Sequence, residues 1–222
     1  MKKFTCQDVT VQQKKTGYKN FFTINQYTLE HALFKGGQIH DLKRECFERG
    51  HAVGVLAYDP WQDSIIFLEQ FRIGAYVHLM AEENNNHSDQ HSPWLVEIIA
   101  GIVEQGESCE DVAHREAQEE AGVELLALES IGCFYSSPGG SSESTKLYCG
   151  CVNSEGVEGV HGLVEEGEDI LVQCVSYSDA VNLLTSGALN NASTLISMQW
   201  LMLHHDEIQK KWQNNLDSTY KN

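Results

Sequence analysis

The chain is organised around a stretch of 23 residues, Gly101-Ile-Val-Glu-Gln-Gly-Glu107-Ser-Cys-Glu-Asp-Val-Ala-His-Arg115-Glu116-Ala-Gln-Glu119-Glu120-Ala-Gly122-Val123. Ser108 followed three residues later by Asp111 is a pattern of the capping-box type, which begins helices. Gly122 supplies the left-handed residue that commonly ends them. The stretch therefore predicts a loop that leads into a helix of about four turns.

One side of this predicted helix is apolar. At about 100° per residue, that side carries Cys109, Val112, Ala113, Ala117 and Ala121. The carboxylates of Glu116, Glu119 and Glu120 fall on or at the edge of the same arc. The opposite, solvent-facing side carries Asp111, His114, Arg115 and Gln118. Arg115, the one Arg or Lys of the helix, is thus expected to point away from the three glutamates.

A run of glutamates is most often a solvated helix face. Here the apolar arc argues otherwise, because burying carboxylates costs several kcal/mol per charge unless a cation compensates. The i, i+3, i+4 spacing brings three carboxylates together on adjacent turns. Ligation by oxygen alone suits Mg²⁺ or Mn²⁺. The helix therefore predicts a divalent-metal site.

This stretch resembles the Nudix box, Gly-x5-Glu-x7-Arg-Glu-U-x-Glu-Glu-x-Gly-U, in which U is a bulky or apolar residue. Every fixed position matches, namely Gly101, Glu107, Arg115, Glu116, Glu119, Glu120 and Gly122, and only Ala117 is small for the first U. The resemblance implies hydrolysis of a nucleoside diphosphate linked to another moiety, with Mg²⁺ held by the helix carboxylates. It gives Glu107 and Arg115 the role of bracing the loop onto the helix.

Composition bounds the other possibilities. The 222 residues, 41% hydrophobic and 21% charged, are enough for one sizeable core in an ordinary soluble protein. The net charge of -17 argues against a nucleic-acid or anionic-membrane partner. No secretion signal or membrane span is indicated. The seven cysteines contain no Cys-x-x-Cys pair, which argues against a zinc ribbon or disulfide framework and favours a cytoplasmic location.

Residues 1–48 are predicted to form a small N-terminal antiparallel β subdomain. Alternating patterns at 9–11, 21–29 and 31–34 indicate short strands, and Gly36-Gly37 offers a hairpin turn. Such a small sheet would be marginally stable alone. We therefore expect it to pack on the main domain or on a partner chain.

Residues 49–222 are predicted to be the hydrolase domain, an α/β fold of the Nudix type in which helices and a mixed sheet form an α/β/α sandwich. Strand patterns cover 51–58, 64–71, 94–100, 125–135, 146–152 and 170–175. Helix patterns cover 178–186, with Ser178 as its cap, and 191–213, with Asn191 or Ser193. Residues 156–167 are expected to be a long acidic connection.

A polar stretch from Ala81 to Pro93 contains two histidines, and His78 is nearby. A metal site is one interpretation. A flexible polar loop is favoured, since nothing apolar anchors the stretch. It looks like an insertion relative to shorter members of the resembling family, and it could alter access or oligomer contacts.

The resemblance extends over about residues 42–206. The segments Glu69-Gln-Phe-Arg72, Ser137-Pro-Gly-Gly140 followed by Glu143, and His161 to Ile170 are similar to bacterial ADP-ribose pyrophosphatases of the Nudix superfamily. From residue types alone, the acidic loop 164–169 would be a solvated charge run. The resemblance instead implies that Glu166 is the catalytic base and that Glu168 joins a metal cluster. In that cluster Glu116, Glu119, Glu120 and the backbone carbonyl of Ala100 bind the cation, with Glu116 and Glu120 also counted as catalytic.

Substrate recognition is also implied by the resemblance. Arg72 matches an arginine that contacts the diphosphate side of ADP-ribose, and Glu143 is placed with the substrate-binding residues. The N-terminal strands are expected to be exchanged between the subunits of a homodimer, with Phe21 and Arg44 as candidates for holding adenine. Ordinary strand packing or a surface ion pair is the alternative for these side chains.

The expected products of ADP-ribose hydrolysis are AMP and ribose 5-phosphate. The box indicates the chemistry and not the leaving group. Another nucleotide sugar, NADH or a dinucleoside polyphosphate therefore remains an alternative substrate. A non-catalytic nucleotide sensor is a third reading, which the intact box carboxylates and the absence of a basic helix disfavour.

Overall fold

The computed structural model describes residues 4–81, 92–163, 165 and 167–220. The chain forms two compact units, one of Met1–His51 with Phe134–Ser144 and the other of Ala52–Cys133 with Thr145–Asn222. No single boundary in the sequence separates the two units, because residues 134–144 belong to the first unit although they lie within the sequence of the second. The domain boundary at residue 48 stays a prediction.

The first unit is a three-stranded antiparallel sheet in the order β1-β2-β3, preceded by a short 3-10 turn at Cys6–Asp8. Its strands are β1 (Val9–Lys19), β2 (Thr23–Ala32) and β3 (Gln38–Glu48). The predicted strands 21–29 and 31–34 were divided wrongly, because β2 continues through Glu30. The chain reverses only at Gly36 and Gly37, whose φ values of 91° and 76° are left-handed.

The second unit contains an eight-stranded sheet in the order β10-β11-β5-β4-β9-β8, with β6 paired to β5 and β7 paired to β4. Its strands are β4 (Ala52–Asp59), β5 (Ser64–Phe71), β6 (Trp94–Glu97), β7 (Ile99–Ile102), β8 (Ala127–Tyr135), β9 (Ser144–Cys151), β10 (Gly159–His161) and β11 (Ile170–Ser176). Strand β4 runs parallel to β9 and antiparallel to β5 and β7, so the sheet is mixed.

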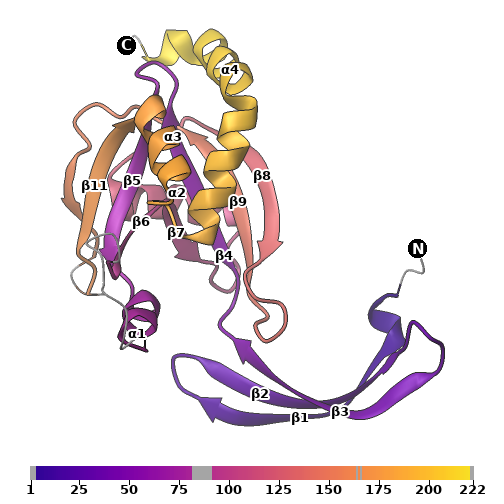
Figure 1. Cartoon of the computed structure of the whole chain (residues 1–222). Coiled ribbons are helices and arrows are strands. Elements are labelled where there is room, and N and C mark those ends of the chain that lie inside the picture. The colour runs from indigo at the N-terminus through magenta and orange to yellow at the C-terminus, as the bar shows by residue number, and fades with distance from the viewer. Residues whose placement is uncertain (1–3, 82–91, 164, 166, 221–222) are drawn as a thin grey trace. The chain divides into compact units, whose positions relative to one another are not determined.

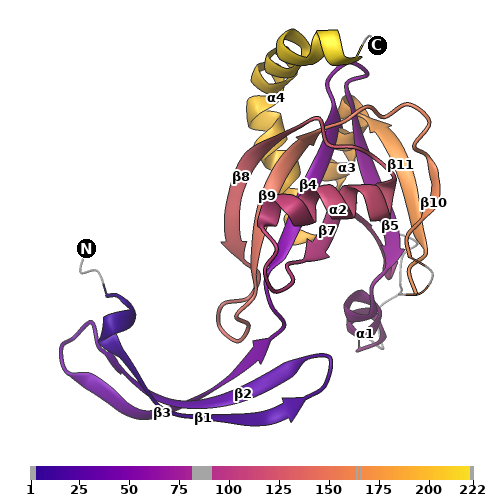
Figure 2. The ribbon, with the colours of Figure 1, turned by 180° about the vertical axis from the view of Figure 1, so that it is seen from behind.

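Helices cover both faces of this sheet. Helix α2 (Cys109–Ala121) lies on one face, and α3 (Tyr177–Ser186) and α4 (Ala192–Tyr220) lie on the other (Figures 1 and 2). The predicted α/β/α sandwich with a mixed sheet and an additional N-terminal antiparallel sheet is confirmed. Of the helices in the described ranges, none combines the length and apolarity of a membrane span.

The core lies between α2 and the central strands. In β4 every residue from Val53 to Asp59 is buried, and in β5 the run Ser64–Leu68 is buried. The buried face of α2 packs on these strands through Val112, Ala113, Ala117 and Ala121. This packing fixes which face of α2 points inward, and with it the position of the box glutamates.

Two local predictions were wrong, and one helix was missed. Helix α1 (Ile73–Ala81) was not predicted, because its residues are mostly apolar but none is buried, so no apolar–polar periodicity marks it. Strand β10 lies inside the acidic connection, where its three residues pair with β11. The cap of α3 is Ser176 and not Ser178, since the Ser176 hydroxyl accepts a hydrogen bond from the Asp179 N–H at 3.1 Å.

Candidate active site

Helix α2 begins and ends where the sequence predicts. The Ser108 hydroxyl accepts from the Asp111 N–H at 3.1 Å, and the Ser108 N–H donates back to the Asp111 carboxylate at 3.3 Å. At the other end Gly122 has a left-handed φ of 65°. Glu120 is buried on the same side of the helix as Val112, Ala113, Ala117 and Ala121.

Glu120 is the most deeply buried carboxylate of the box, with 3% of its surface exposed. Its Oε2 accepts a hydrogen bond from the Ala100 N–H at 2.9 Å, which ties α2 to strand β7. Burial raises the pKa of Glu120 to about 8, and the negative charges of Glu116 and Glu168 act in the same direction. The Ala100 N–H and the positive charge of Arg72 oppose the rise.

Glu116 lies directly against the box glycine. A Cβ atom built on Gly101 would lie 1.7 Å from Glu116 Oε1. Any side chain at position 101 would displace this carboxylate, so the glycine leaves room for Glu116. Burial raises the pKa of Glu116, and the neighbouring Arg115 guanidinium opposes the rise.

The prediction that Arg115 points away from the glutamates is wrong. Its Nη1 donates to Glu116 Oε1 at 2.7 Å and to Glu119 Oε2 at 3.0 Å, and its Nε donates to Glu107 Oε1 at 3.2 Å. The helical projection places the Cα atom, whereas the long side chain can bend along the helix surface. Arg115 therefore compensates two of the box glutamates and also ties the preceding loop to the helix through Glu107.

Glu168 is hydrogen-bonded to the backbone of Leu163, five residues earlier. Its Oε2 accepts from the Leu163 N–H at 2.9 Å, and the Glu168 N–H donates to the Leu163 carbonyl at 3.2 Å. Gly162, with a left-handed φ of 99°, allows the close approach, since a Cβ there would lie 2.8 Å from Glu168 Cβ. The predicted catalytic base, Glu166, lies outside the described residues, as do residues 82–91 of the predicted polar insertion.

The donor set fits a hard divalent cation. Within the described ranges, no three Asp, Glu, His or Cys side chains already stand in a metal-holding arrangement. Glu119 is engaged by Arg115 at 3.0 Å. All the candidate donors are nevertheless oxygens, and Glu120 is a buried carboxyl whose ionisation is opposed by two neighbouring carboxylates. A bound cation would relieve this repulsion and lower the pKa of Glu120.

Arg72, which follows β5, forms an ion pair with the buried Glu97 carboxylate, and the sequence did not predict this pair. Its Nε and Nη2 both lie 2.7 Å from Glu97 Oε2. The Glu97 side chain is 5% exposed, and its Oε1 accepts from Asn191 Nδ2 at 2.7 Å. The sequence did contain one indication of this pair. Glu97 is a charged residue inside the apolar run Trp94-Leu-Val-Glu-Ile-Ile-Ala100, and a buried charge requires a partner.

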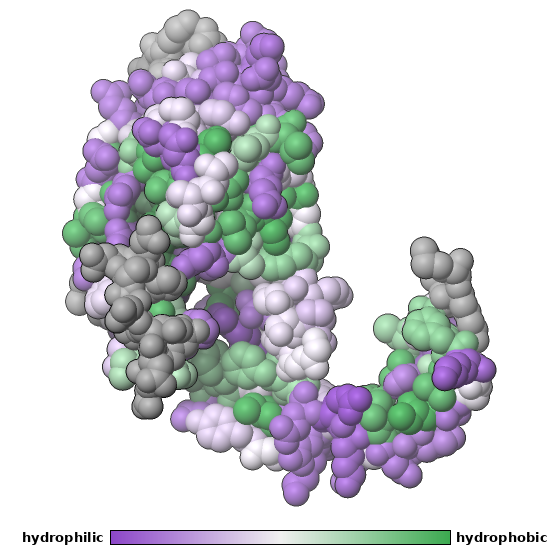
Figure 3. Space-filling model, in the orientation of Figure 1, coloured by the Kyte–Doolittle hydropathy of each residue, from purple (hydrophilic) through white to green (hydrophobic). Residues whose placement is uncertain are grey.

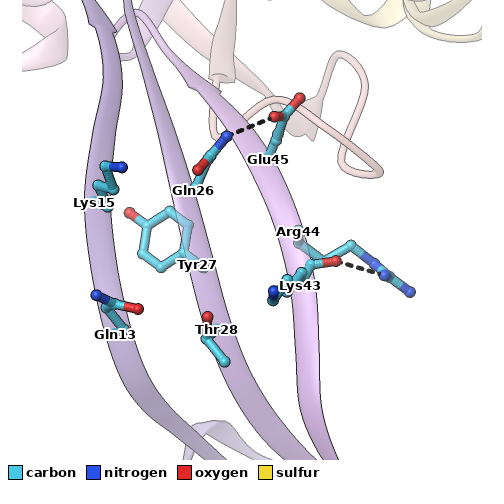
Figure 4. Close-up of a pocket in the computed structure, with 8 residues that line it drawn as sticks. All are labelled: Gln13, Lys15, Gln26, Tyr27, Thr28, Lys43, Arg44 and Glu45. Atoms are coloured by element: carbon cyan, nitrogen blue, oxygen red, sulfur yellow. Dashed lines mark hydrogen bonds between the residues drawn. The ribbon is translucent and has the colours of Figure 1, made fainter.

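The other proposed substrate residues belong to the first unit. Arg44 lines a pocket of about 440 Å³ on the three-stranded sheet, and its Nη1 donates to the Lys43 carbonyl at 2.8 Å (Figure 4). Phe21 is 81% exposed and packs edge to face on Phe22. Glu143 pairs with Arg49 at 3.6 Å. Arg72 and the box glutamates belong to the second unit.

Comparison with known proteins defines the class. Residues 50–195 match the NUDIX domain family. The chain therefore belongs to the Nudix hydrolase family, and the resemblance drawn from the box is confirmed.

The similar proteins narrow the class further. The ADP-ribose pyrophosphatase of Escherichia coli K12 is 40% identical over 209 residues, which cover 94% of this chain and 95% of that protein. The ADP-ribose pyrophosphatase of Haemophilus influenzae is 41% identical over 212 residues, 96% of this chain and 94% of that protein. A GDP-mannose pyrophosphatase of Shigella flexneri is 28% identical over 199 residues, covering 90% and 97%. A crystal structure of an ADP compounds hydrolase shares the fold, with a TM-score of 0.61 at 18% identity over 90% of this chain and 97% of that one.

Proposed function

We propose that this chain hydrolyses the diphosphate bond of ADP-ribose, with AMP and ribose 5-phosphate as products. The single observation that carries the proposal is the box carboxylate cluster, in which the buried Glu120 carboxyl accepts from the Ala100 N–H at 2.9 Å and Glu116 lies against Gly101. Identity of 40% to an ADP-ribose pyrophosphatase over 94% of the chain supports the choice of substrate.

The proposed metal ligands are Glu116, Glu119, Glu120, Glu168 and the carbonyl of Ala100. The proposed ion is Mg²⁺, with Mn²⁺ as the alternative, because all of these donors are oxygens. When bound, such a cation lowers the pKa of a coordinated water and neutralises charge on the diphosphate. Arg115 engages one oxygen of Glu116 and one of Glu119, so the cation would take the other oxygens or displace the guanidinium, which its bond to Glu107 would still hold beside the loop.

The proposed base is Glu166. It accepts a proton from water, and the resulting hydroxide attacks one phosphorus in line with the bridging oxygen. A new P–O bond forms at that phosphorus, the bridging P–O bond breaks, and the leaving phosphate carries the electron pair. Arg72 binds the diphosphate oxygens and holds the substrate in place.

The first unit is proposed to supply the adenine side of the site, through Phe21 and Arg44, and Glu143 is proposed as a further substrate-binding residue. We propose a homodimer with exchanged N-terminal strands. Exposed Phe21 and the pocket beside Arg44 support a binding role for this unit. All seven cysteines are free, which is consistent with the cytoplasmic location that we propose.

A second candidate function is hydrolysis of another nucleoside-diphosphate compound, such as a nucleotide sugar, NADH or a dinucleoside polyphosphate. Identity of 28% to a GDP-mannose pyrophosphatase gives this reading weaker support. A non-catalytic sensor is a further alternative. The complete set of box carboxylates disfavours it.

Analysis of the reaction products, with purified protein and Mg²⁺, tests this proposal. ADP-ribose is offered beside GDP-mannose, ADP-glucose, NADH and diadenosine tetraphosphate, each at the same subsaturating concentration. The proposal predicts the highest kcat/KM for ADP-ribose, with AMP as a product, and loss of that activity in Glu166→Gln. A higher kcat/KM for another compound would overturn the substrate, and no turnover of any compound would favour the sensor.

A further inference from the structure

The strand that carries the box entry is interrupted at Ile98. Strand β6 pairs with β5 up to Glu97, and β7 pairs with β4 from Ile99 onward. The Ile98 N–H therefore lies between two ladders, and it donates instead to the Thr194 hydroxyl of helix α4 at 3.2 Å. The break thus depends on α4 for its hydrogen bonding.

The start of α4 also contacts Glu97, the residue that precedes Ile98. Asn191 precedes the helix, and its Oδ1 accepts from the Thr194 N–H at 3.2 Å, as an N-cap does. Its Nδ2 points to a different partner and donates to Glu97 Oε1 at 2.7 Å. Asn191 therefore makes two different contacts. Its Oδ1 accepts the capping hydrogen bond of α4, and its Nδ2 donates to the buried carboxylate of Glu97.

Glu97 transmits this contact to Arg72. Its Oε2 accepts from both Nε and Nη2 of Arg72, whose side chain is 42% exposed. A half-exposed arginine samples several rotamers, and ordering it on a ligand costs conformational entropy. Asn191 binds Oε1 and Arg72 binds Oε2, so both oxygens of Glu97 are engaged, an arrangement that favours one orientation of the guanidinium before substrate binds.

We propose that Asn191 is a positioning residue for the diphosphate, acting through Glu97 on Arg72. The proposal rests on the proposed function, in which Arg72 binds the diphosphate. The Nδ2 atom, which donates to Glu97, positions Arg72, whereas the Oδ1 atom only caps helix α4. Asn191 lies 94 residues from Glu97 in sequence, so the α4 turn couples the far face of the sheet to the site.

The two tasks can be separated by Asn191→Ser. A serine hydroxyl still caps α4, because Ser and Asn are comparably good caps, but it is too short to reach Glu97. We expect the KM for ADP-ribose to rise about fivefold, with kcat within about twofold, since the loss is one of preorganised binding. The matched control is Ser176→Asn at the cap of α3, which exchanges the same two residue types away from Glu97 and should leave both constants unchanged.

A double-mutant cycle tests the route through Arg72. In an Arg72→Ala background, Asn191→Ser should change kcat/KM by less than about twofold. An equal effect with and without Arg72 would overturn the proposal. So would a fall in kcat with unchanged KM, which a merely structural loss of active protein would give.

A measurement without turnover separates this proposal from the proposed function. The chain has four arginines, so the Nε–H signals in a ¹⁵N spectrum are few, and the signal lost in Arg72→Ala identifies Arg72. Asn191→Ser should accelerate exchange of this Nε–H with water at least about fivefold, because its carboxylate acceptor is no longer fixed. Unchanged exchange contradicts the positioning, whereas accelerated exchange in a protein that does not hydrolyse ADP-ribose contradicts only the substrate.

Discussion

The two units use β-strands in opposite ways. In β4 every residue from Val53 onward is buried, whereas in β1 every residue is exposed. Charge divides along the same line. Of the chain's 15 Lys and Arg, nine lie in the first unit, against six of its 32 Asp and Glu. The second unit therefore carries all of the chain's negative excess, and the first is mildly basic.

The first sheet has polar contacts where the second has an apolar core. Asn25, 2% exposed, donates to Glu48 Oε2 at 2.7 Å and accepts from the Thr16 hydroxyl at 2.9 Å, and the Tyr27 hydroxyl also donates to Glu48. Hydrophobic residues are exposed among hydrophilic ones on this unit (Figure 3), and the large exposed side chains include Val11, Tyr18, Phe21 and Phe34. The second unit thus has buried central strands, whereas the first exposes large apolar side chains, as surfaces that bind a partner chain do.

Replacing a glycine should have very different results in the two units. Gly101→Ala places a Cβ 1.7 Å from Glu116 Oε1, so we expect kcat to fall by at least about 100-fold as that carboxylate is displaced. Gly17→Ala in β1 meets its nearest atom at 3.5 Å, an ordinary contact, and should keep wild-type kcat. Steady-state rates with ADP-ribose measure both. Comparable losses in the two variants would break the comparison.

The buried carboxyl of the second unit should make metal-free stability depend on pH. Glu120 has a folded pKa of about 8, above its ordinary value of 4.5, so between these values the folded state holds a proton that the unfolded state has lost. In EDTA the free energy of unfolding should therefore fall as pH rises through this window, by up to about 1.4 kcal/mol per pH unit. Urea unfolding across pH 5 to 8 measures the slope.

The control for this slope is Glu120→Gln, which keeps an acceptor for the Ala100 N–H but does not titrate. It should show a flatter profile and greater stability above pH 5 without metal. A wild-type profile in this variant would assign the slope to other groups. Saturating Mg²⁺ should also flatten the wild-type profile, because cation binding favours the ionised carboxyl.

The polar network of the first sheet can be tested locally. Asn25→Ala leaves the Glu48 carboxylate and the Thr16 hydroxyl without one partner each, at a cost of about 1–3 kcal/mol. Hydrogen exchange should accelerate in β1–β3 and stay unchanged in β4 and β5. Uniform acceleration across both units would show that they unfold together and that the division has no energetic meaning.

The smallest expected effect concerns the cap of α3. Ser176→Ala removes the acceptor of the Asp179 N–H and should lower the free energy of unfolding by about 1 kcal/mol. Ser178→Ala, two residues later in the first turn, should change it by less than about 0.5 kcal/mol. Chemical denaturation of the two variants decides between the caps, and a larger loss in Ser178→Ala would restore the sequence assignment.

How far sequence could predict this molecule depends on the range of each interaction. The beginning of α2 follows from a contact three residues apart, Ser108 with Asp111, and its end follows from Gly122, so both were predicted. The direction of the Arg115 side chain was not, because helical projection ignores side-chain reach. Helix α1 lacks a buried face to give periodicity. The Arg72–Glu97 and Glu97–Asn191 contacts join residues 25 and 94 positions apart, so only the folded sheet and helix bring them together.

We propose that the carboxylate cluster around Glu120 performs metal-assisted hydrolysis of a nucleoside diphosphate linkage. The most direct test is the rate of AMP release from ADP-ribose by wild type and Glu120→Gln at saturating Mg²⁺, with circular dichroism to verify folding. If the cluster acts in this way, the variant folds and its kcat is reduced by at least about 100-fold. A folded Glu120→Gln with near wild-type turnover would contradict it.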